Sequence, residues 1–379
     1  MYDFTPHQLE VQQKVRDYVR EYITPNLAAI DSGDVPEEIF PAWFKTGLIC
    51  LVAPKSVGGV EFDAQTSAIV LEELAYGDTG IATAFGANNL GSYPLIIAGT
   101  PEQQKQHFTP LLEGKYGAFA LTEANAGSDA GAVATIAEKK GDEYVLNGTK
   151  CYITQGGFAI DMESSMVLFA STDREAGSKG LSAFLVKGGT PGLSVGKIED
   201  KMGIRGSQTV ELVIEDLKLP ASALLGAEGD GMKIAMKTLD SGRLMVAAQG
   251  VGCGQSALDL AIDYVKNRLD GGRPLGKQQA VAFKLAEMEA YVEAARRVVY
   301  RGCQLKDDKQ PYSHYSAIAK LFATDMAMKV ALDAMDIMGT YGFSKDSMIE
   351  KIWRDARILS IYEGTNQIQK LVISGGLLR

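Results

Sequence analysis

The 379-residue chain is 46% hydrophobic, which is enough to bury a large core and to form two or three domains. A formal net charge of −9 and an isoelectric point near 5.1 exclude the basic surface that nucleic-acid-binding proteins present. Four scattered cysteines without a Cys-x-x-Cys pair argue against a disulfide framework or a zinc site, and three scattered histidines argue against a metal hydrolase.

The first 115 residues are predicted to be helical. Apolar residues recur at three- and four-residue intervals from Leu9 to Ile23 and again between residues 68 and 75. Pro25 and Gly77 are expected to end or kink these helices, and Pro101 to begin a new one. We therefore expect an N-terminal helical domain over residues 1–115.

Neither a secretory signal nor a membrane-spanning segment is expected. The sequence begins without a basic stretch followed by an apolar one, and no apolar run is long enough to cross a bilayer. We expect a cytoplasmic protein of bacterial type, with a mature protein of the mitochondrial matrix as the alternative.

The hydrophobic period changes near Tyr116, where short β-rich runs replace the helical pattern. Gly, Asn, Asp and Pro clusters separate these runs, which are 116–121, 143–146, 150–154, 166–170, 181–186 and 209–214. Because no helical pattern lies between them, they predict an antiparallel sheet or barrel over residues 116–228 rather than βαβ units. Asn147-Gly148 predicts a two-residue hairpin between two of the strands.

The helical period returns after Pro220 and predicts a C-terminal helical domain over residues 229–379. Two glycine-rich matches in it are discounted, because no strand precedes either one. Residues 271–277 have the spacing of a phosphate-binding P-loop, but Gln278 stands where a Ser or Thr would hold magnesium. Residues 252–257 match a loose dinucleotide fingerprint, and we expect their small side chains to let two helices pack closely.

The most informative stretch is residues 357–369, where an apolar run leads into Glu363 and Gly364 follows directly. Thr365 is a predicted N-cap for the last helix, and such a helix start offers free N–H groups to an anion. An isolated Glu-Gly-Thr is more often a surface loop. The importance of Glu363 therefore depends on the other motifs of the chain.

The loop of residues 121–129 follows the first β-rich run and carries hydroxyls, backbone amides and Gly, which suit a polar cofactor edge. Its residue order closely resembles the acyl-CoA dehydrogenase family, in its short- and medium-chain flavin enzymes. The resemblance continues in the family's order through residues 147–157, 199–207, 239–243, 354–357 and 362–369. It covers almost the whole chain.

The resemblance implies a fold, a reaction and partners. The implied fold is α+β, with an N-terminal α-helical domain, a middle antiparallel β-barrel or sandwich domain and a C-terminal four-helix bundle. The implied reaction is the FAD-dependent α,β-dehydrogenation of an acyl-CoA to a 2-enoyl-CoA, with electrons passed to an electron-transferring flavoprotein. A homotetramer, built as a dimer of dimers, is also implied.

The resemblance also implies roles for single residues. Glu363 matches the catalytic base, whose amide holds the thioester oxygen together with a ribityl hydroxyl of FAD. Contacts with FAD are implied for Leu121, Thr122, Ser128, Tyr152, Thr154, Arg268, Gln279, Asp336, Gly339, Thr365 and Gln367. Contacts with acyl-CoA are implied for Ser128, Asp240, Arg243, Tyr362 and Gly364. Arg268 and Gln279 match residues that reach the FAD of a neighbouring subunit. The segment 84–94 matches the lining of the acyl tunnel, with Phe85, Asn88, Leu90 and Tyr93.

The chemistry agrees with Glu363 as the base. Removing hydrogens from C2 and C3 of a thioester needs a base for the C2 proton and a cofactor that accepts the C3 hydride. A carboxylate with a usual pKa of ~4.3 is a weak base, so the site must exclude water and stabilise the enolate-like oxygen. Some relatives carry their base near residues 239–243, where this chain has Ser241-Gly242. Glu363 is therefore the only candidate base that lies in a matching motif.

Some positions depart from the family pattern. Asp270-Gly271-Gly272 replaces a usual Gln-Phe-Gly, Asp336 stands where a Gln commonly meets the FAD phosphates, and Thr340 replaces a Gly. A carboxylate beside a pyrophosphate is repelled by about 1 kcal/mol or more. We hypothesise that an altered set of contacts across the subunit interface holds the adenine-diphosphate end of FAD.

The sequence leaves alternatives open. An enoyl-CoA reductase would run the same reaction backwards, and a dehydrogenase for branched or cyclic acyl-CoA would use the same motifs. A catalytically silent CoA-binding protein is disfavoured because Glu363, Thr122, Thr154 and Arg243 are present together. Acyl length, direction and the electron acceptor are not set by the sequence.

Overall fold

The computed structural model describes residues 4–378 and begins with a set of helices. These are α1 (Pro6–Tyr18), α2 (Leu27–Ser32), α3 (Ile39–Lys45), α4 (Ala64–Gly77), α5 (Thr79–Ala98) and α6 (Pro101–Leu112). Thr5 and Thr100 close capping boxes at the starts of α1 and α6, and Asp63 and Asp78 cap α4 and α5. The predicted helical character of this part is confirmed.

The end of α1 shows the irregularity expected near Pro25. A π-helical turn, Val19–Ile23, and a 3₁₀ turn, Thr24–Asn26, separate α1 from α2. The predicted apolar stripe is correct for Val15 and Ile23, which are fully buried, but wrong for Leu9, which is half exposed.

The middle part is an eight-stranded sheet with the order β6-β7-β3-β2-β4-β5-β8, in which β1 pairs with β4. The strands are β1 (Ala118–Ala120), β2 (Ile136–Lys140), β3 (Glu143–Thr154), β4 (Ser165–Ser171), β5 (Leu181–Lys187), β6 (Leu193–Ile198), β7 (Thr209–Pro220) and β8 (Leu224–Leu225). Most pairs are antiparallel as predicted, although β4 runs parallel to β1 and to the first residue of β2. A short helix, α7 (Gly156–Asp161), follows β3.

The hairpin predicted at Asn147-Gly148 is wrong. Both residues lie inside β3, which continues without a turn from Glu143 to Thr154 and pairs with β7 along its length. A register shift between Leu146 and Gly148 takes the place of the turn, and the Asn147 side chain accepts from the backbone N–H of Asp216 on β7. The local turn signal was overridden because these residues pair with a distant strand.

The sheet is buried on both of its faces along β4. Met166 and Leu168 pack into the core within the sheet, whereas Val167 and Phe169 belong to a second core that includes Leu95 and residues of α6 and α8. A strand covered on both faces is continuously apolar. This explains the run of seven buried residues in β4.

The C-terminal part is helical. It contains α8 (Gly231–Asn267), α9 (Gln279–Asp307), α10 (Ser313–Met338), α11 (Ile349–Leu359) and α12 (Asn366–Leu377). Residues 271–277 fall in the exposed connection around the short β9 (Leu269–Asp270) and β10 (Arg273–Pro274) hairpin, not after a core strand. A Cβ on Gly252 would lie 2.0 Å from the Glu72 carbonyl oxygen of α4, so this glycine lets α8 and α4 pack closely, as expected.

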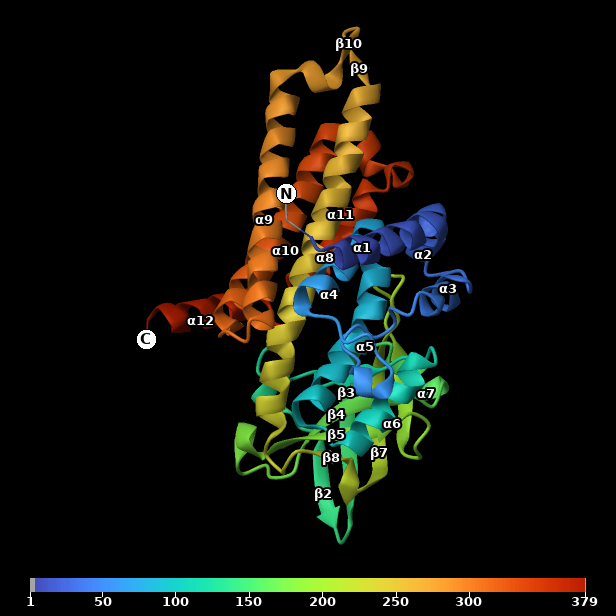
Figure 1. The fold of residues 1–379 in the computed structure, drawn as a ribbon, viewed down its shortest axis with the longest axis vertical. Coiled ribbons are helices and arrows are strands. Elements are labelled where there is room, and N and C mark those ends of the chain that lie inside the picture. The colour runs from blue at the N-terminus through green and yellow to red at the C-terminus, as the bar shows by residue number, and fades with distance from the viewer. Residues whose placement is uncertain (1–3, 379) are drawn as a thin grey trace.

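Figure 1 shows how the parts are arranged. The sheet occupies one end of the molecule and the β9–β10 hairpin the other, and the 37-residue α8 runs between them. The helix α5 reaches from the other N-terminal helices toward the sheet, and α12 projects from the body. Within residues 4–378, no helix combines the length and apolarity needed to cross a membrane.

A buried charge cluster joins all three parts. Lys351 of α11 donates to Asp78, which caps α5, and to Asp355 of α11 at 2.5 Å. Asp355 also accepts from the backbone N–H of Ile204, in the loop between β6 and β7, at 2.5 Å. Burial opposes the charge of Lys351, but Asp78 and Asp355 raise its pKa above the usual value. Helices from both ends of the chain are thereby tied to the sheet.

Candidate active site

A small cavity lies where α5, α8 and the end of β3 meet the segment before α12. Its volume is about 60 Å³, and its lining includes Leu90, Thr154, Met245, Tyr362 and Glu363. The structure therefore brings together three of the residues that the sequence predicts for cofactor, substrate and base: Thr154, Tyr362 and Glu363.

Glu363 occupies a tight turn. Its φ is +55°, and the φ of Gly364 is +86°, so two successive residues adopt the left-handed region that favours glycine. The Oε2 atom of Glu363 is buried and has no hydrogen-bond partner among the described residues. A Cβ on Gly242 of α8 would lie 2.5 Å from this Oε2 atom. The missing side chain at position 242 thus makes room for the carboxylate.

The surroundings of Glu363 change its acidity. Burial raises its pKa to about 7, against the opposing effect of the cations Arg243 and Lys320. Arg243 is buried on α8 and pairs with Asp240 at 2.7 Å. Ser313 also donates to Asp240, at 2.8 Å. A carboxyl group with a pKa near neutrality is suited to proton transfer.

A hydrogen-bonded group forms part of the cavity lining. The Tyr362 hydroxyl donates to Gln249 Oε1 at 2.6 Å and lies 3.3 Å from Thr83 Oγ1. All three residues line the cavity, as do Leu90 and Tyr93. Leu90 and Tyr93 therefore line the cavity, as the expected acyl tunnel requires.

The same expectation is wrong for Phe85 and Asn88. The Phe85 ring stacks on Trp43 with centroids 4.7 Å apart. Asn88 donates to the Ile49 carbonyl and accepts from the Gly117 N–H. Both side chains bind α5 to its neighbours, because they lie on other faces of the helix than Leu90.

The loop after β1 is held by a buried ion pair. Lys150 Nζ lies 2.6 Å from Glu123 Oε1 and also donates to the Leu121 carbonyl. Burial lowers the pKa of Lys150 to about 8 in spite of Glu123. The Thr122 carbonyl accepts from the Cys151 N–H at 2.8 Å. Leu121 is buried, Thr122 is partly buried, and Ser128, farther along the loop, is exposed.

This region fits a flavin ring. Tyr152 lies within a register shift of β3, has a φ of +58° and is 65% exposed, so a flat aromatic ligand can lie against its ring. The Thr122 and Thr154 hydroxyls are partly buried and have no hydrogen-bond partner in the described part of the chain. Such free hydroxyls can bond the polar edge of a flavin.

Other expected FAD contacts lie far from the cavity. Arg268, Gln279, Asp336 and Gly339 are exposed at the ends of α8, α9 and α10, toward the β9–β10 hairpin. Thr365 caps α12, as predicted, and Gln367 is exposed in its first turn. Within one chain, Arg268, Gln279, Asp336 and Gly339 therefore do not contact Thr154 or Glu363.

The departures from the family pattern have local partners. Asp336 and Asp333 both pair with Lys284 of α9, at 3.1 and 3.2 Å. Asp270 accepts from the Gln278 side chain. A cation therefore already lies beside the carboxylate that was expected to repel a pyrophosphate.

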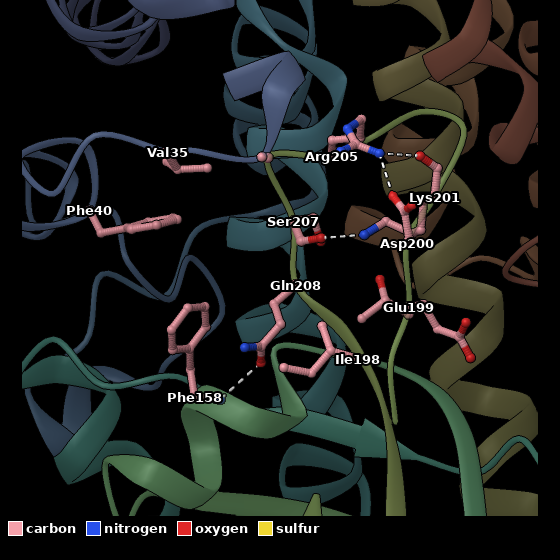
Figure 2. A pocket seen from close by; sticks show the side chains of 13 residues that line it. Val35, Phe40, Phe158, Ile198, Glu199, Asp200, Lys201, Arg205, Ser207 and Gln208 are labelled. Carbon is pink, nitrogen blue, oxygen red and sulfur yellow. Dashed lines mark hydrogen bonds and ion pairs between the residues drawn. The ribbon is translucent and has the colours of Figure 1, made fainter. Parts of the chain in front are cut away.

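A larger cavity of about 370 Å³ lies between residues 33–40 and the connection from β6 to β7 (Figure 2). Its cations are bonded to the protein: Arg205 pairs with Asp200 at 2.6 Å, and Lys201 donates to the Ser207 carbonyl at 2.7 Å. None of the site residues expected from the sequence lines it. We therefore place the chemistry at the cavity beside Glu363.

Several residues of the site were not predicted from the sequence. Thr83 lines the cavity from α5, ahead of the segment 84–94 that was expected there and that supplies Gly86, Ala87 and Leu90, while Gly242, Met245, Val246 and Gln249 line it from α8. Each set has the spacing i, i+3, i+4, i+7 of one helical face. That spacing was present in the sequence, but it is equally typical of ordinary core packing.

The chain was compared with known proteins. Models of the N-terminal, middle and C-terminal domains of acyl-CoA dehydrogenase match residues 5–115, 118–217 and 229–378. The human mitochondrial short-chain specific acyl-CoA dehydrogenase is 43% identical over 98% of this chain and 90% of its own length. The structure of butyryl-CoA dehydrogenase from Megasphaera elsdenii aligns with a TM-score of 0.96 and 41% identity over 100% of both chains.

A second solved structure aligns equally well with this chain. It is described as the electron transferring flavoprotein of Acidaminococcus fermentans, in work on flavin-based electron bifurcation. Its TM-score is 0.96, with 40% identity over 100% of both chains. The full-length matches agree with the three-part fold. The chain belongs to the acyl-CoA dehydrogenase family and is an FAD-dependent oxidoreductase.

Proposed function

We propose that the protein oxidises a short-chain acyl-CoA to the 2-enoyl-CoA, with Glu363 as the base that removes the C2 proton. The observation that carries this proposal is the Glu363 carboxylate. It has a buried oxygen without a partner and lines the same cavity as Thr154. A carboxylate left without a partner in the protein is available to a proton of the substrate.

The environment makes Glu363 a stronger base than a carboxylate in water. With a pKa of about 7, roughly half of the groups are ionised at neutral pH, and the ionised form binds a proton far more tightly than an ordinary carboxylate. Arg243 keeps the ionised form accessible by opposing the effect of burial. Bound FAD supplies the acceptor for the C3 hydride.

The negative charge that develops on the thioester oxygen needs donors. The backbone N–H groups of Glu363 and Gly364 donate to no acceptor within residues 4–378. The left-handed turn fixes their directions beside the cavity. We assign the Glu363 N–H as a donor to that oxygen, because a fixed dipole needs no reorganisation during the reaction.

The size of the cavity favours a short acyl chain. Its 60 Å³ has room for only about four to six water-sized groups. The Tyr362 hydroxyl is hydrogen-bonded to Gln249 and to Thr83, and these polar groups in the lining would have to be displaced by a longer apolar chain. The names of the human and Megasphaera relatives also refer to short-chain and butyryl-CoA substrates.

We propose an electron-transferring flavoprotein as the acceptor. The similar chain from Acidaminococcus fermentans supports this assignment, because the description of its structure names an electron transferring flavoprotein. The exposure of Tyr152 supports a flavin site with one edge near the surface, where an acceptor protein can approach. Reduction of a purified electron-transferring flavoprotein by butyryl-CoA, dependent on this enzyme, tests it.

The Glu363→Gln variant tests the assignment of the base. Glutamine keeps the shape of the side chain but cannot accept the proton, so we expect flavin bleaching by butyryl-CoA to slow by about 10²–10⁴-fold. The yellow cofactor and the melting temperature should be retained. Wild-type bleaching should fall as the pH drops below about 7, because Glu363 is then protonated.

The control is a series of straight-chain acyl-CoAs with the wild-type enzyme. We expect butyryl-CoA to bleach the flavin faster than octanoyl-CoA. Near-normal turnover by Glu363→Gln would assign the proton to another residue. A preference for octanoyl-CoA would contradict the short-chain assignment only.

A further inference from the structure

Lys320 of α10 is buried below the turn that carries Glu363. Its side chain is fully buried, yet no carboxylate in the described part of the chain lies within ion-pair distance of it. Nζ donates to the Gly364 carbonyl at 2.8 Å and to Asn366 Oδ1 at 2.9 Å. Lysine is among the residues least often fully buried without a charged partner, so its presence here requires an explanation.

The contacts of Lys320 hold the Glu363–Gly364 turn. The Gly364 carbonyl accepts from Lys320 and also from Gln369 Nε2, at 2.8 Å in each case. Asn366 is fixed in turn by Thr324 of α10, to which it donates at 3.0 Å. These bonds stabilise a backbone in which Glu363 has an unfavourable positive φ.

Lys320 is also one of the few cations that act on the Glu363 carboxylate. Arg243 faces that carboxylate from α8 and Lys320 from α10, and both lower its pKa against the effect of burial. Burial, together with the charge of Glu363, raises the pKa of Tyr93 on α5 and of Tyr362, which precedes Glu363 in the chain. Burial lowers the pKa of Lys320 itself to about 7, while Glu363 and Asp325 oppose that shift.

We propose that Lys320 is a positioning residue for the base: Nζ fixes the Gly364 carbonyl and so the left-handed turn, and its positive charge favours the ionised Glu363 carboxylate. The inference rests on the proposed role of Glu363. It assigns to Lys320 a function that packing alone would not require, because a methionine would fill a similar volume without a buried charge.

The experiment compares Lys320→Gln, Lys320→Met and the control Thr324→Val in the FAD-loaded enzyme. Glutamine can still donate to the Gly364 carbonyl but has no charge, and methionine has neither property. Thr324→Val loosens the same hydrogen-bonded group without a change of charge. Protonation of Glu363 is followed by the infrared band of its carboxylic acid, assigned by its absence in Glu363→Gln.

We expect the midpoint of that band to move to higher pH in both Lys320 variants and to stay at the wild-type value in Thr324→Val. If the midpoint lies one pH unit higher, about tenfold fewer Glu363 groups are ionised below it, so bleaching should slow about tenfold at pH 6 and recover as the pH rises. Lys320→Gln should recover further than Lys320→Met, because it retains a donor to the turn.

An unchanged midpoint in folded Lys320→Gln would overturn the inference, whatever its melting temperature. An active Glu363→Gln would instead refute the proposed function. If Lys320→Met does not fold, the infrared titration of Lys320→Gln still decides.

Discussion

At the scale of single residues, the site depends on what is missing beside Glu363 as much as on what is present. Gly242 leaves the space that the carboxylate occupies, and no polar group of the described chain satisfies Oε2. A buried acceptor without a partner costs stability, on the order of 1–3 kcal/mol. This loss of stability falls at the position where we propose that a proton is removed from the substrate.

Gly242→Ala should therefore damage activity more than stability. The added methyl group would meet Oε2 at 2.5 Å, and the end of a flexible side chain can move away at little cost to the fold. The displaced carboxylate would then miss the C2 proton. We expect at least a tenfold loss of bleaching rate with a melting temperature within a few degrees of the wild type.

The matched control for this change is Gly375→Ala. Gly375 lies in α12, and no heavy atom is within 4 Å of the position of an added Cβ. Alanine there should leave bleaching unchanged, and it favours the helix by up to about 1 kcal/mol. Equal bleaching rates for Gly242→Ala and the wild type would show that the carboxylate does not need this space.

At the scale of elements, α5 and α11 are fixed to the β6–β7 loop by the cluster around Lys351. Asp78 both caps α5 and binds Lys351, and Asp355 both binds Lys351 and accepts from the Ile204 N–H. The helix α11 ends only four residues before Glu363. The cluster thus sets the position from which the turn of the base begins.

Lys351→Met should destabilise the protein by about 3–5 kcal/mol, because it leaves two buried carboxylates without their cation. Burial already raises the pKa of Asp355, so the loss should be larger at pH 8 than at pH 5, where the carboxylates can take up protons. Urea unfolding at both pH values measures this. Lys329→Met, which removes an exposed ion pair to Asp333, should cost less than about 1 kcal/mol at either pH.

Many elements could be predicted from the sequence, because the helices carry regular apolar spacing and clear caps such as Thr100 and Thr365. Asn147-Gly148 could not be read correctly, since β7 is more than 60 residues away and its pairing outweighs the local turn preference. Lys320 could not be found either. A lysine in an alanine-rich helix is typical of a solvated face, and its partners lie 44 and 46 residues later.

At the scale of the whole molecule, one chain carries only part of the proposed cofactor site. Arg268 and Gln279 are exposed at the end of the molecule far from the sheet (Figure 1). Large apolar side chains are exposed beside them, including Leu269 at 61% and Phe283 at 63%. Exposed apolar groups beside residues without a local ligand indicate an interface. We propose that copies of the chain cover this end and complete the site, as in the expected homotetramer.

Phe283→Glu should weaken that assembly. A charge in place of an exposed ring opposes burial between subunits, so we expect smaller oligomers by light scattering and an FAD dissociation constant raised at least tenfold. Leu9→Glu, on exposed α1 surface, should change neither property. A wild-type oligomer with wild-type FAD affinity in Phe283→Glu would place the interface elsewhere.

The register shift in β3 has a further consequence for how the sequence can vary. Between Lys150 and Ile153 the strand holds one residue more than its partner β7, and this extra residue resets which side chains point to each face. Deleting Cys151 or Tyr152 would restore an even ladder in which Ile153 and Thr154 keep their partners Val210 and Thr209. The sheet would then retain its pairing but lose the left-handed position at which the exposed Tyr152 ring is presented, so strand length here is constrained by the site rather than by the sheet.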